Sequence, residues 1–125
     1  MVKKFQRLDL RIPPDYSLSV EVLKKMEKEI QCDTKETIKF LQAISHPTRL
    51  RVLRALRIKE LCVCVLVALM KIKYSKLSYH LKILKKAGLV ESEKRKNFLI
   101  YRLTGLGRKV LADLERPSED QGRQL

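Results

Sequence analysis

The chain has 125 residues, enough for one domain with short extensions, and its 45% hydrophobic content excludes a disordered chain. The formal net charge of +14, from 28 basic and 14 acidic residues, favours a polyanionic partner, either nucleic acid or an anionic membrane surface. The longest apolar run, residues 61–70, is too short for a membrane span of about 20 residues, so we expect no membrane partner.

The N-terminus and the cysteines both indicate a reducing compartment. The first ten residues are charged and lack the apolar core of a signal peptide, so we expect a cytoplasmic location. The three cysteines are an odd number, which argues against a disulfide framework and predicts reduced thiols.

The N-terminal segment is predicted to be an arm followed by one helix. Residues 1–16 contain Pro13 and Pro14, which cannot continue a helix. In residues 17–30 an apolar side chain recurs every fourth position on one face, at Leu18, Val22, Met26 and Ile30. Such a helix outside the main domain needs a partner surface.

Two further helices are predicted from their start signals. Asp33 followed by Glu36 resembles a capping box, so a helix is expected over residues 34–44. Pro47 suits a first helical position and starts a second helix to about residue 56. The side chains expected to be buried are Ile38, Leu41 and Ile44 in the first helix, and Leu50, Leu53 and Leu56 in the second.

Residues 60–70 are apolar on every side and rich in valine, a pattern that fits a strand or a helix. We predict a short strand over residues 60–63 that passes into a buried helix over residues 64–71.

The segment 74–87 is predicted to be a helix with two distinct faces. Leu77, Leu81 and Leu84 make a narrow apolar stripe. A second stripe is small, polar and basic and contains no acid: Ser75, Ser78, Tyr79, Lys82 and Lys86. Gly88 is expected to end this helix in a left-handed conformation.

The C-terminal part is predicted to be a hairpin and a last helix. Residues 89–95 and 98–103 read as strands joined by a turn at Lys96 and Asn97, and residues 105–115 read as a helix. The tail from residue 117 is polar and expected to be flexible. A helix pair followed by a basic hairpin predicts a mainly α fold with a small β-hairpin, the winged helix-turn-helix.

The charge is concentrated where this fold meets double-stranded DNA. Residues 71–102 carry ten basic and two acidic residues, a net charge of +8. An α-helix fits the DNA major groove, and lysines can neutralise phosphates. The candidate DNA-binding residues are Lys73, Tyr74, Ser75, Lys76, Ser78, Tyr79, Lys82, Lys94, Arg95 and Lys96.

Other interpretations of these residues stay open. The basic face could be an ordinary solvated surface, and Tyr79 could shield the edge of the core. We expect His80 to be a hydrogen-bonded structural residue rather than a ligand or a base. The domain could also serve protein assembly in place of DNA binding. An enzyme is not expected, because the sequence has no carboxylate pair, no nucleophile with its base and no phosphate-binding glycine loop.

Cys62 and Cys64 are candidate ligands for a thiophilic inducer. In an extended segment their side chains point to the same side, whereas in a helix they lie about 200° apart. Two converging thiolates suit As(III), Sb(III), Cd(II), Pb(II) or Zn(II). Cys32 is the one remaining thiol that could complete the site. Buried cysteines can also be simple apolar residues, or the pair could respond to oxidants.

Several motifs together resemble the arsenical-resistance repressor (ArsR/SmtB) family over roughly residues 34–114. They are SHPTRLRVL at residues 45–53, ELCVCVL at residues 60–66, SKLSYHLK at residues 75–82, AGLV at residues 87–90 and IYRL at residues 100–103. The third motif resembles the family's DNA-recognition helix, and the second its thiol inducer site.

The resemblance implies a homodimeric repressor on an inverted-repeat operator, needing no cofactor to bind DNA and released when an inducer binds Cys62 and Cys64. It implies four parts: an arm and dimerisation helix (1–32), the DNA-binding domain (33–104), a C-terminal dimerisation helix (105–116) and a tail (117–125).

The sequence departs from the family pattern at several positions. Val65 stands where an aspartate is usual, and Val67 where arsenite sensors have a third cysteine. Lys71 and Lys73 replace the usual glycine and serine, which weakens the cap of the recognition helix. The last helix has no histidine, so the family's zinc site at the dimer interface is not expected.

Overall fold

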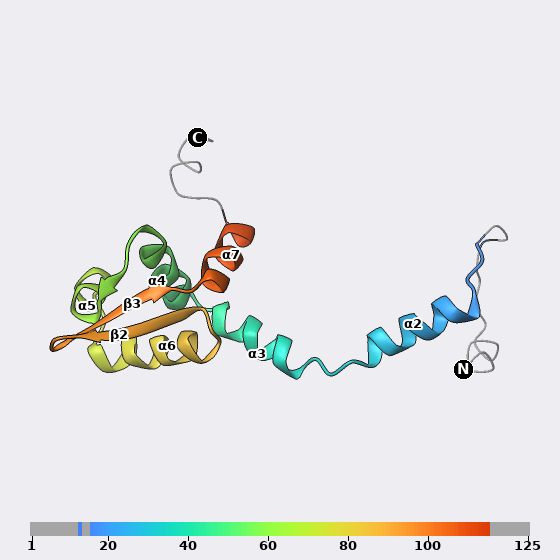
Figure 1. Ribbon diagram of the computed structural model, residues 1–125, viewed down its shortest axis with the longest axis horizontal. Coiled ribbons are helices and arrows are strands. Elements are labelled where there is room, and N and C mark those ends of the chain that lie inside the picture. Colours follow the sequence, from blue (N-terminus) through green and yellow to red (C-terminus); the bar gives the residue numbers. More distant parts are fainter. Residues whose placement is uncertain (1–12, 14–15, 116–125) are drawn as a thin grey trace, which may run out of the picture. The chain divides into compact units, whose positions relative to one another are not determined.

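The structure is a computed structural model that describes residue 13 and residues 16–115. The predicted arm lies almost entirely outside the described residues, and the predicted tail lies wholly outside them. The elements follow the predicted order (Figure 1). They are α2 (Val20–Gln31), α3 (Lys35–Ile44), α4 (Pro47–Ile58), β1 (Leu61–Cys62), α5 (Val63–Met70), α6 (Tyr74–Lys86), β2 (Val90–Arg95), β3 (Phe98–Leu103) and α7 (Gly105–Leu114).

The chain divides into two compact units, residues 1–35 and residues 36–125. In the first unit, α2 confirms the predicted amphipathic helix, but it starts three residues later than expected. Ser19 explains the later start, because its hydroxyl accepts a hydrogen bond from the N–H of Val22 at 3.2 Å and so caps the helix. The apolar face of α2 is exposed, with Met26 45% and Ile30 79% accessible.

In the second unit, α3 begins one residue after the predicted start, and it buries fewer side chains than expected. The Asp33 carboxylate accepts a hydrogen bond from the N–H of Lys35 at 3.0 Å. Ile44 is buried, whereas Ile38 is 47% and Leu41 is 49% exposed. The prediction that all three pack inward is therefore wrong for two of them, because no described element of this unit covers that face of α3.

Helix α4 confirms the start at Pro47. His46 caps it, because the Nδ1 atom of His46 accepts a hydrogen bond from the N–H of Thr48 at 3.1 Å. Leu53 and Leu56 are buried as predicted, while Leu50 is half-buried. A third residue of this helix, Val52, is also buried, and the three side chains lie at the centre of the core.

The short strand β1 joins the hairpin to make one antiparallel sheet in the order β1-β3-β2. Leu61 lies opposite Tyr101 and Cys62 opposite Ile100. The sequence predicted the strand and the hairpin separately, because strand pairing over this distance has no local signal. Helix α5 follows directly; Leu66 is buried, but Leu69 is 61% exposed, so the helix is buried on one face only.

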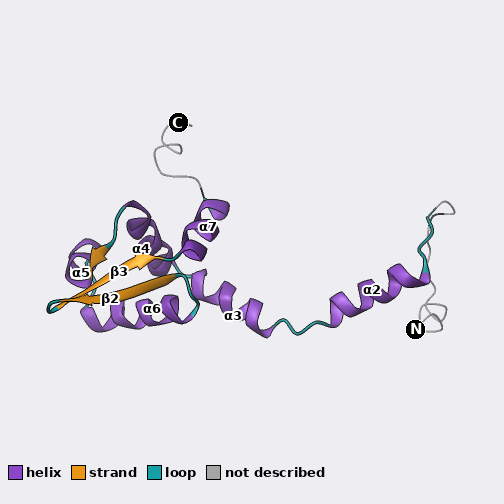
Figure 2. Ribbon diagram, in the orientation of Figure 1, coloured by secondary structure: helices purple, strands orange, loops and turns teal. Residues whose placement is uncertain are grey.

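Helix α6 runs alongside the hairpin (Figure 2) and ends as predicted. Gly88 has a φ of +79°, which favours glycine. The N–H of Leu89 donates to the carbonyl of Leu84, and the N–H of Gly88 donates to that of Lys85, both at 3.0 Å. This is the Schellman arrangement, and it turns the chain directly into β2.

Thr104 joins the end of the hairpin to α7. Its hydroxyl donates to the carbonyl of Gly88 at 2.6 Å and accepts from the N–H of Gly107 at 2.9 Å. A Cβ at Gly107 would overlap the carbonyl of Leu89, so the close approach of α7 requires this glycine. None of the helices in the described part of the chain is long and apolar enough to cross a membrane.

Candidate nucleic-acid interface and thiol pair

The two predicted faces of α6 are separated in the structure. Leu77, Leu81 and Leu84 are at most 1% exposed and form the centre of the core. All five residues of the polar stripe are exposed: Ser75, Ser78, Tyr79, Lys82 and Lys86. Burial of the leucines fixes the rotation of the helix, so hydroxyls and lysines point to solvent with no acid among them.

The N-terminal turn of α6 is cationic and lacks a side-chain cap. Lys73 occupies the N-cap position, and within the described residues no side chain accepts a hydrogen bond there. Lysine has no acceptor, so the first N–H groups of the helix remain available as donors. Tyr74 and Lys76 are exposed beside them. Free N–H groups with lysines are suited to bind phosphate.

His80 lies between the two faces of α6 and is only 3% exposed. Its Nδ1 atom accepts a hydrogen bond from the Nε atom of Arg49 at 3.2 Å. Arg49 also donates to the carbonyls of Gln42 and Ala43, so it ties α6 to the end of α3. Burial lowers the pKa of His80, and His46, Arg49 and Lys76 lower it further by repulsion. His80 is therefore a structural residue, as expected.

The hairpin places its predicted DNA-binding residues in different directions. Side chains alternate along a strand, so Lys94 lies on the face that carries the buried Val90, while Arg95 lies on the opposite face. Lys96 sits in the turn with a φ of 56°. Lys94, Arg95 and Lys96 are all exposed, but Arg95 shares its strand face with the acids described next.

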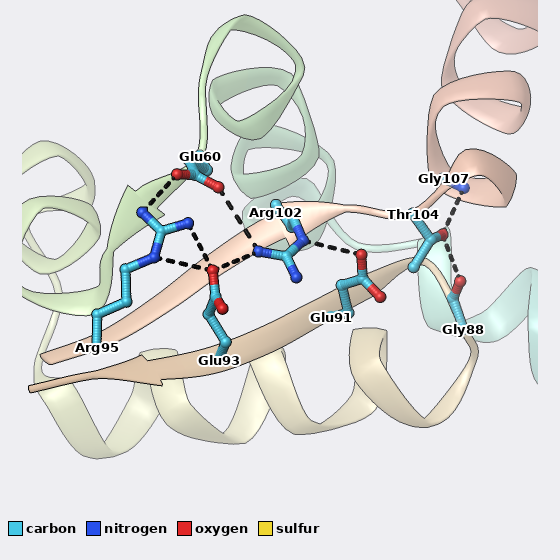
Figure 3. Close-up of polar contacts among 8 residues, drawn as sticks. All are labelled: Glu60, Gly88, Glu91, Glu93, Arg95, Arg102, Thr104 and Gly107. Carbon is cyan, nitrogen blue, oxygen red and sulfur yellow. Dashed lines mark hydrogen bonds and ion pairs between the residues drawn. The ribbon is translucent and has the colours of Figure 1, made fainter.

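Arg95 belongs to an ion-pair network that joins the hairpin to the residue before β1 (Figure 3). Its guanidinium lies 2.7 Å from Glu60 and 2.5 Å from Glu93. Arg102 binds Glu91 at 2.9 Å and Glu93 at 2.8 Å, and lies 3.7 Å from Glu60. We call these five residues the wing network. Three carboxylates face two guanidinium groups, so this face of the hairpin is not basic.

The wing network also shifts the ionisation of its members. Hydrogen bonds from Arg102 and then Arg95 lower the pKa of Glu93, and the carboxylates raise the pKa of both arginines. The sequence did not predict the wing network, and it indicated Arg95 as a candidate DNA-binding residue. The available signal was the alternation of Glu91, Glu93 and Arg95, which places all three on one face of a strand.

Cys62 and Cys64 converge, with their sulfur atoms 2.7 Å apart and both thiols free. The geometry differs from the fully extended segment considered from sequence. Cys62 is extended and caps α5, while Cys64 is in the first helical turn. Their mutual hydrogen bond lowers the pKa of Cys62 and raises that of Cys64.

A third ligand for this thiol pair is not evident. Among the residues that the structure describes, no group of three or more histidine, cysteine or acidic side chains could hold a metal ion. Cys32 is exposed at the end of α2, in the N-terminal unit. The pair by itself offers two soft sulfur ligands, an incomplete set for the thiophilic ions.

Comparison with known proteins places the chain in a family. Residues 46–92 match the family model of the bacterial regulatory protein, arsR family. A transcriptional repressor SmtB homolog of Synechocystis is 35% identical over 74 residues, which are 58% of this chain. The chain spans 56% of the length of that curated relative.

Solved structures agree with this assignment. The transcriptional regulator HlyU from Vibrio vulnificus is 30% identical, with a TM-score of 0.58 over 74% of this chain and 93% of that one. A homodimeric winged helix-turn-helix DNA-binding domain from Mycobacterium bovis, 22% identical, has a TM-score of 0.63 over 76% of this chain and 94% of that one and supports the fold alone. The protein has the winged helix-turn-helix fold, and it belongs to the ArsR family of bacterial regulatory proteins.

Proposed function

We propose that the protein is a DNA-binding transcriptional repressor whose α6 enters the major groove. The observation that carries this proposal is the division of α6 into a buried leucine face and an exposed hydroxyl and lysine face. Ser75, Ser78 and Tyr79 would meet base edges or phosphates, and lysines would neutralise phosphates. The family consists of transcriptional regulators, and we propose no catalytic activity.

The remaining candidate residues would bind the DNA backbone. Lys73, Tyr74 and Lys76 surround the uncapped start of α6, where N–H groups and positive charge favour a phosphate. At the hairpin tip, Lys94 and Lys96 pair with no carboxylate among the residues that the structure describes, and Arg95 would bind DNA only after it leaves its carboxylates.

We further propose that the protein acts as a homodimer on an inverted-repeat operator. The apolar residues Ile38 and Leu41 on α3, and Leu106 and Leu114 on α7, are 47–59% exposed, which supports a partner surface on these helices. A symmetric dimer presents two α6 helices about 34 Å apart to successive major grooves. We expect it to act in the cytoplasm, where its operator DNA lies.

The proposed inducer is a thiophilic ion or metalloid that binds Cys62 and Cys64, with Cys32 as the candidate third ligand. The 2.7 Å approach of the two sulfurs supports a shared ligand. The site lies at the start of α5, next to the sheet, so ligand binding there can change the geometry of the DNA-binding elements.

The test is a gel shift on duplex DNA from upstream of the protein's own gene, titrated with arsenite, antimonite, cadmium, lead and zinc. We expect binding without inducer and release by at least one ion. A Cys62→Ser, Cys64→Ser double variant should bind DNA equally and ignore the inducer. Absence of duplex binding at low salt would refute the repressor. Binding that none of these ions changes would refute the inducer proposal, and release by an oxidant alone would assign redox sensing.

A further inference from the structure

The wing network and the thiol pair lie on the same face of the sheet. The register places Cys62 opposite Ile100, and Ile100 opposite Glu93, in one row across the three strands. Extending the register of β1 by one residue sets Glu60 opposite Arg102, in the next row on the same face of the sheet. Cys62 thus stands two residues from Glu60 with its side chain on the same side.

The ion pair between Glu60 and Arg95 crosses the row that contains Cys62. Arg95 lies opposite Phe98, in the row on the far side of Cys62, yet its guanidinium reaches Glu60 at 2.7 Å (Figure 3). Glu60 is the member of the wing network that does not belong to the hairpin; the other four are on β2 and β3. Glu60 is therefore the member of the wing network that joins the segment bearing Cys62 to the arginines of the hairpin.

We propose that Glu60 is a positioning residue that couples the thiol pair to the tip of the wing. When a ligand binds the two cysteines, the ion pair between Glu60 and Arg95 weakens. The expected effect on DNA binding rests on the proposed function. The coupling between the cysteines and the hairpin tip does not, because it involves contacts within one protomer.

The expected change follows from where the two cysteines lie. Cys62 is the last residue of β1 and Cys64 lies in the first turn of α5, so a ligand bound to both sulfurs joins the strand to the helix. Strand β1 has only two residues, so it has little hydrogen bonding of its own to keep its place when a ligand binds. Glu60 directly precedes this strand, so a shift of β1 reaches Glu60 and weakens its ion pair with Arg95.

A matched pair of variants separates this link from a simple change in charge. Glu60→Gln and Glu91→Gln each remove one carboxylate from the wing network and one negative charge from the protein. Within the wing network, Glu60 links the start of β1 to Arg95, whereas Glu91 binds Arg102 within the hairpin. Both variants are made with Cys32→Ser, so that the thiol pair is the sole thiol site.

The probe is phenylarsine oxide, which bridges two thiols. Two S–As bonds form, the bond from arsenic to oxygen breaks, and the oxygen leaves as water with the two thiol protons, with arsenic remaining As(III). Mass spectrometry confirms one adduct per chain. Hydrogen exchange of the backbone over residues 94–99 is then measured in the free protein.

We expect the adduct to speed exchange at the tip about twofold to fivefold in the parent protein, the range for loss of an exposed ion pair. Glu60→Gln should show the faster exchange before the probe is added and no further increase with it. Glu91→Gln should respond to the probe as the parent does. Equal behaviour of the two variants, or a probe effect that leaves the tip unchanged, would overturn the proposal.

The same variants are then tested on duplex DNA. The probe should weaken DNA binding by the parent and by Glu91→Gln, and weaken it less in Glu60→Gln. Absence of any DNA binding would overturn the proposed function without affecting the exchange result, so the two failures are distinguishable. An equal loss of DNA binding in both variants would overturn the role of Glu60 in regulation.

Discussion

Lys71 ends α5 in the left-handed region, with a φ of 55° and a ψ of 42°. A side chain with a Cβ loses roughly 1 kcal/mol in this conformation, and glycine does not. We predict that Lys71→Gly raises the free energy of unfolding by about 1 kcal/mol, measured by urea denaturation.

Lys59 provides the control for that prediction. It caps α4 with a φ of −164°, an extended conformation that any residue adopts. Lys59→Gly removes the same charge and should lower the free energy of unfolding by about 0.5 kcal/mol, because glycine loses more backbone entropy. If the two variants change stability in the same direction, the strain assigned to Lys71 is wrong.

The buried imidazole of His80 makes stability depend on pH. Its pKa is lowered in the folded protein, chiefly by burial, so the unfolded chain binds a proton more readily. Stability is therefore retained above pH 6.5, the ordinary pKa, and falls as the pH decreases from there to the lower folded pKa.

We predict that His80→Asn flattens this part of the pH profile. The asparagine oxygen can still accept the hydrogen bond from Arg49, but the side chain does not titrate. Urea denaturation between about pH 7.5 and pH 5.5 tests this. Parallel profiles for the two proteins would show that His80 does not cause the loss.

At the scale of elements, α6 combines a leucine face that fixes it in the core with an uncapped, cationic N-terminus. Stability and DNA binding favour different residues at the N-cap position of α6, residue 73. A serine at residue 73 would accept a hydrogen bond from the first turn, whereas the lysine can neutralise a phosphate.

We predict that Lys73→Ser raises the free energy of unfolding by about 1 kcal/mol and weakens DNA binding, with the salt dependence reduced by about one phosphate per protomer. Lys73→Ala is the control, because it removes the charge without adding a cap. It should weaken DNA binding equally and leave stability nearly unchanged. Equal stability of the serine and alanine variants would contradict the uncapped start.

The sequence predicts these elements well where the signals are local. The leucine spacing of α6, the glycine after it and Pro47 each act within one or two helical turns, and the structure agrees at all three places. Residues 61–70 carry no such signal, because an all-apolar segment has no periodicity. The strand and the helix there were predicted from length and valine content alone.

The features that the sequence did not predict depend on contacts between residues far apart in the chain. Arg95 pairs with Glu60, which is 35 positions earlier, and no local pattern indicates that contact. Exposure of Ile38 and Leu41 likewise depends on what covers α3, whereas periodicity reports only that the two residues share a face. The thiols converge, as one interpretation predicted, and they do so at a junction between strand and helix that the sequence also predicted within one or two residues.

At the scale of the whole molecule, the exposed apolar faces of α3 and α7 are the basis of the proposed dimer. We predict that Leu41→Lys shifts the protein from dimer to monomer in analytical ultracentrifugation, because it places a charge in an apolar interface. Lys39→Leu tests the alternative that any change on α3 disrupts assembly, and it should leave the dimer intact. A monomeric parent protein, or a dimer that persists in Leu41→Lys, would contradict this interface.

The central claim is that the exposed face of α6 binds duplex DNA, and the salt dependence of binding tests it most directly. With about 6–10 phosphate contacts, affinity should fall by about 10³–10⁵ between 50 and 200 mM salt, measured by fluorescence anisotropy. Lys82→Gln should reduce the salt slope by about 1 per protomer, whereas Lys109→Gln, on α7, should leave it unchanged. No duplex binding at about 50 mM salt, or equal slopes for these two variants, would contradict DNA binding by this face.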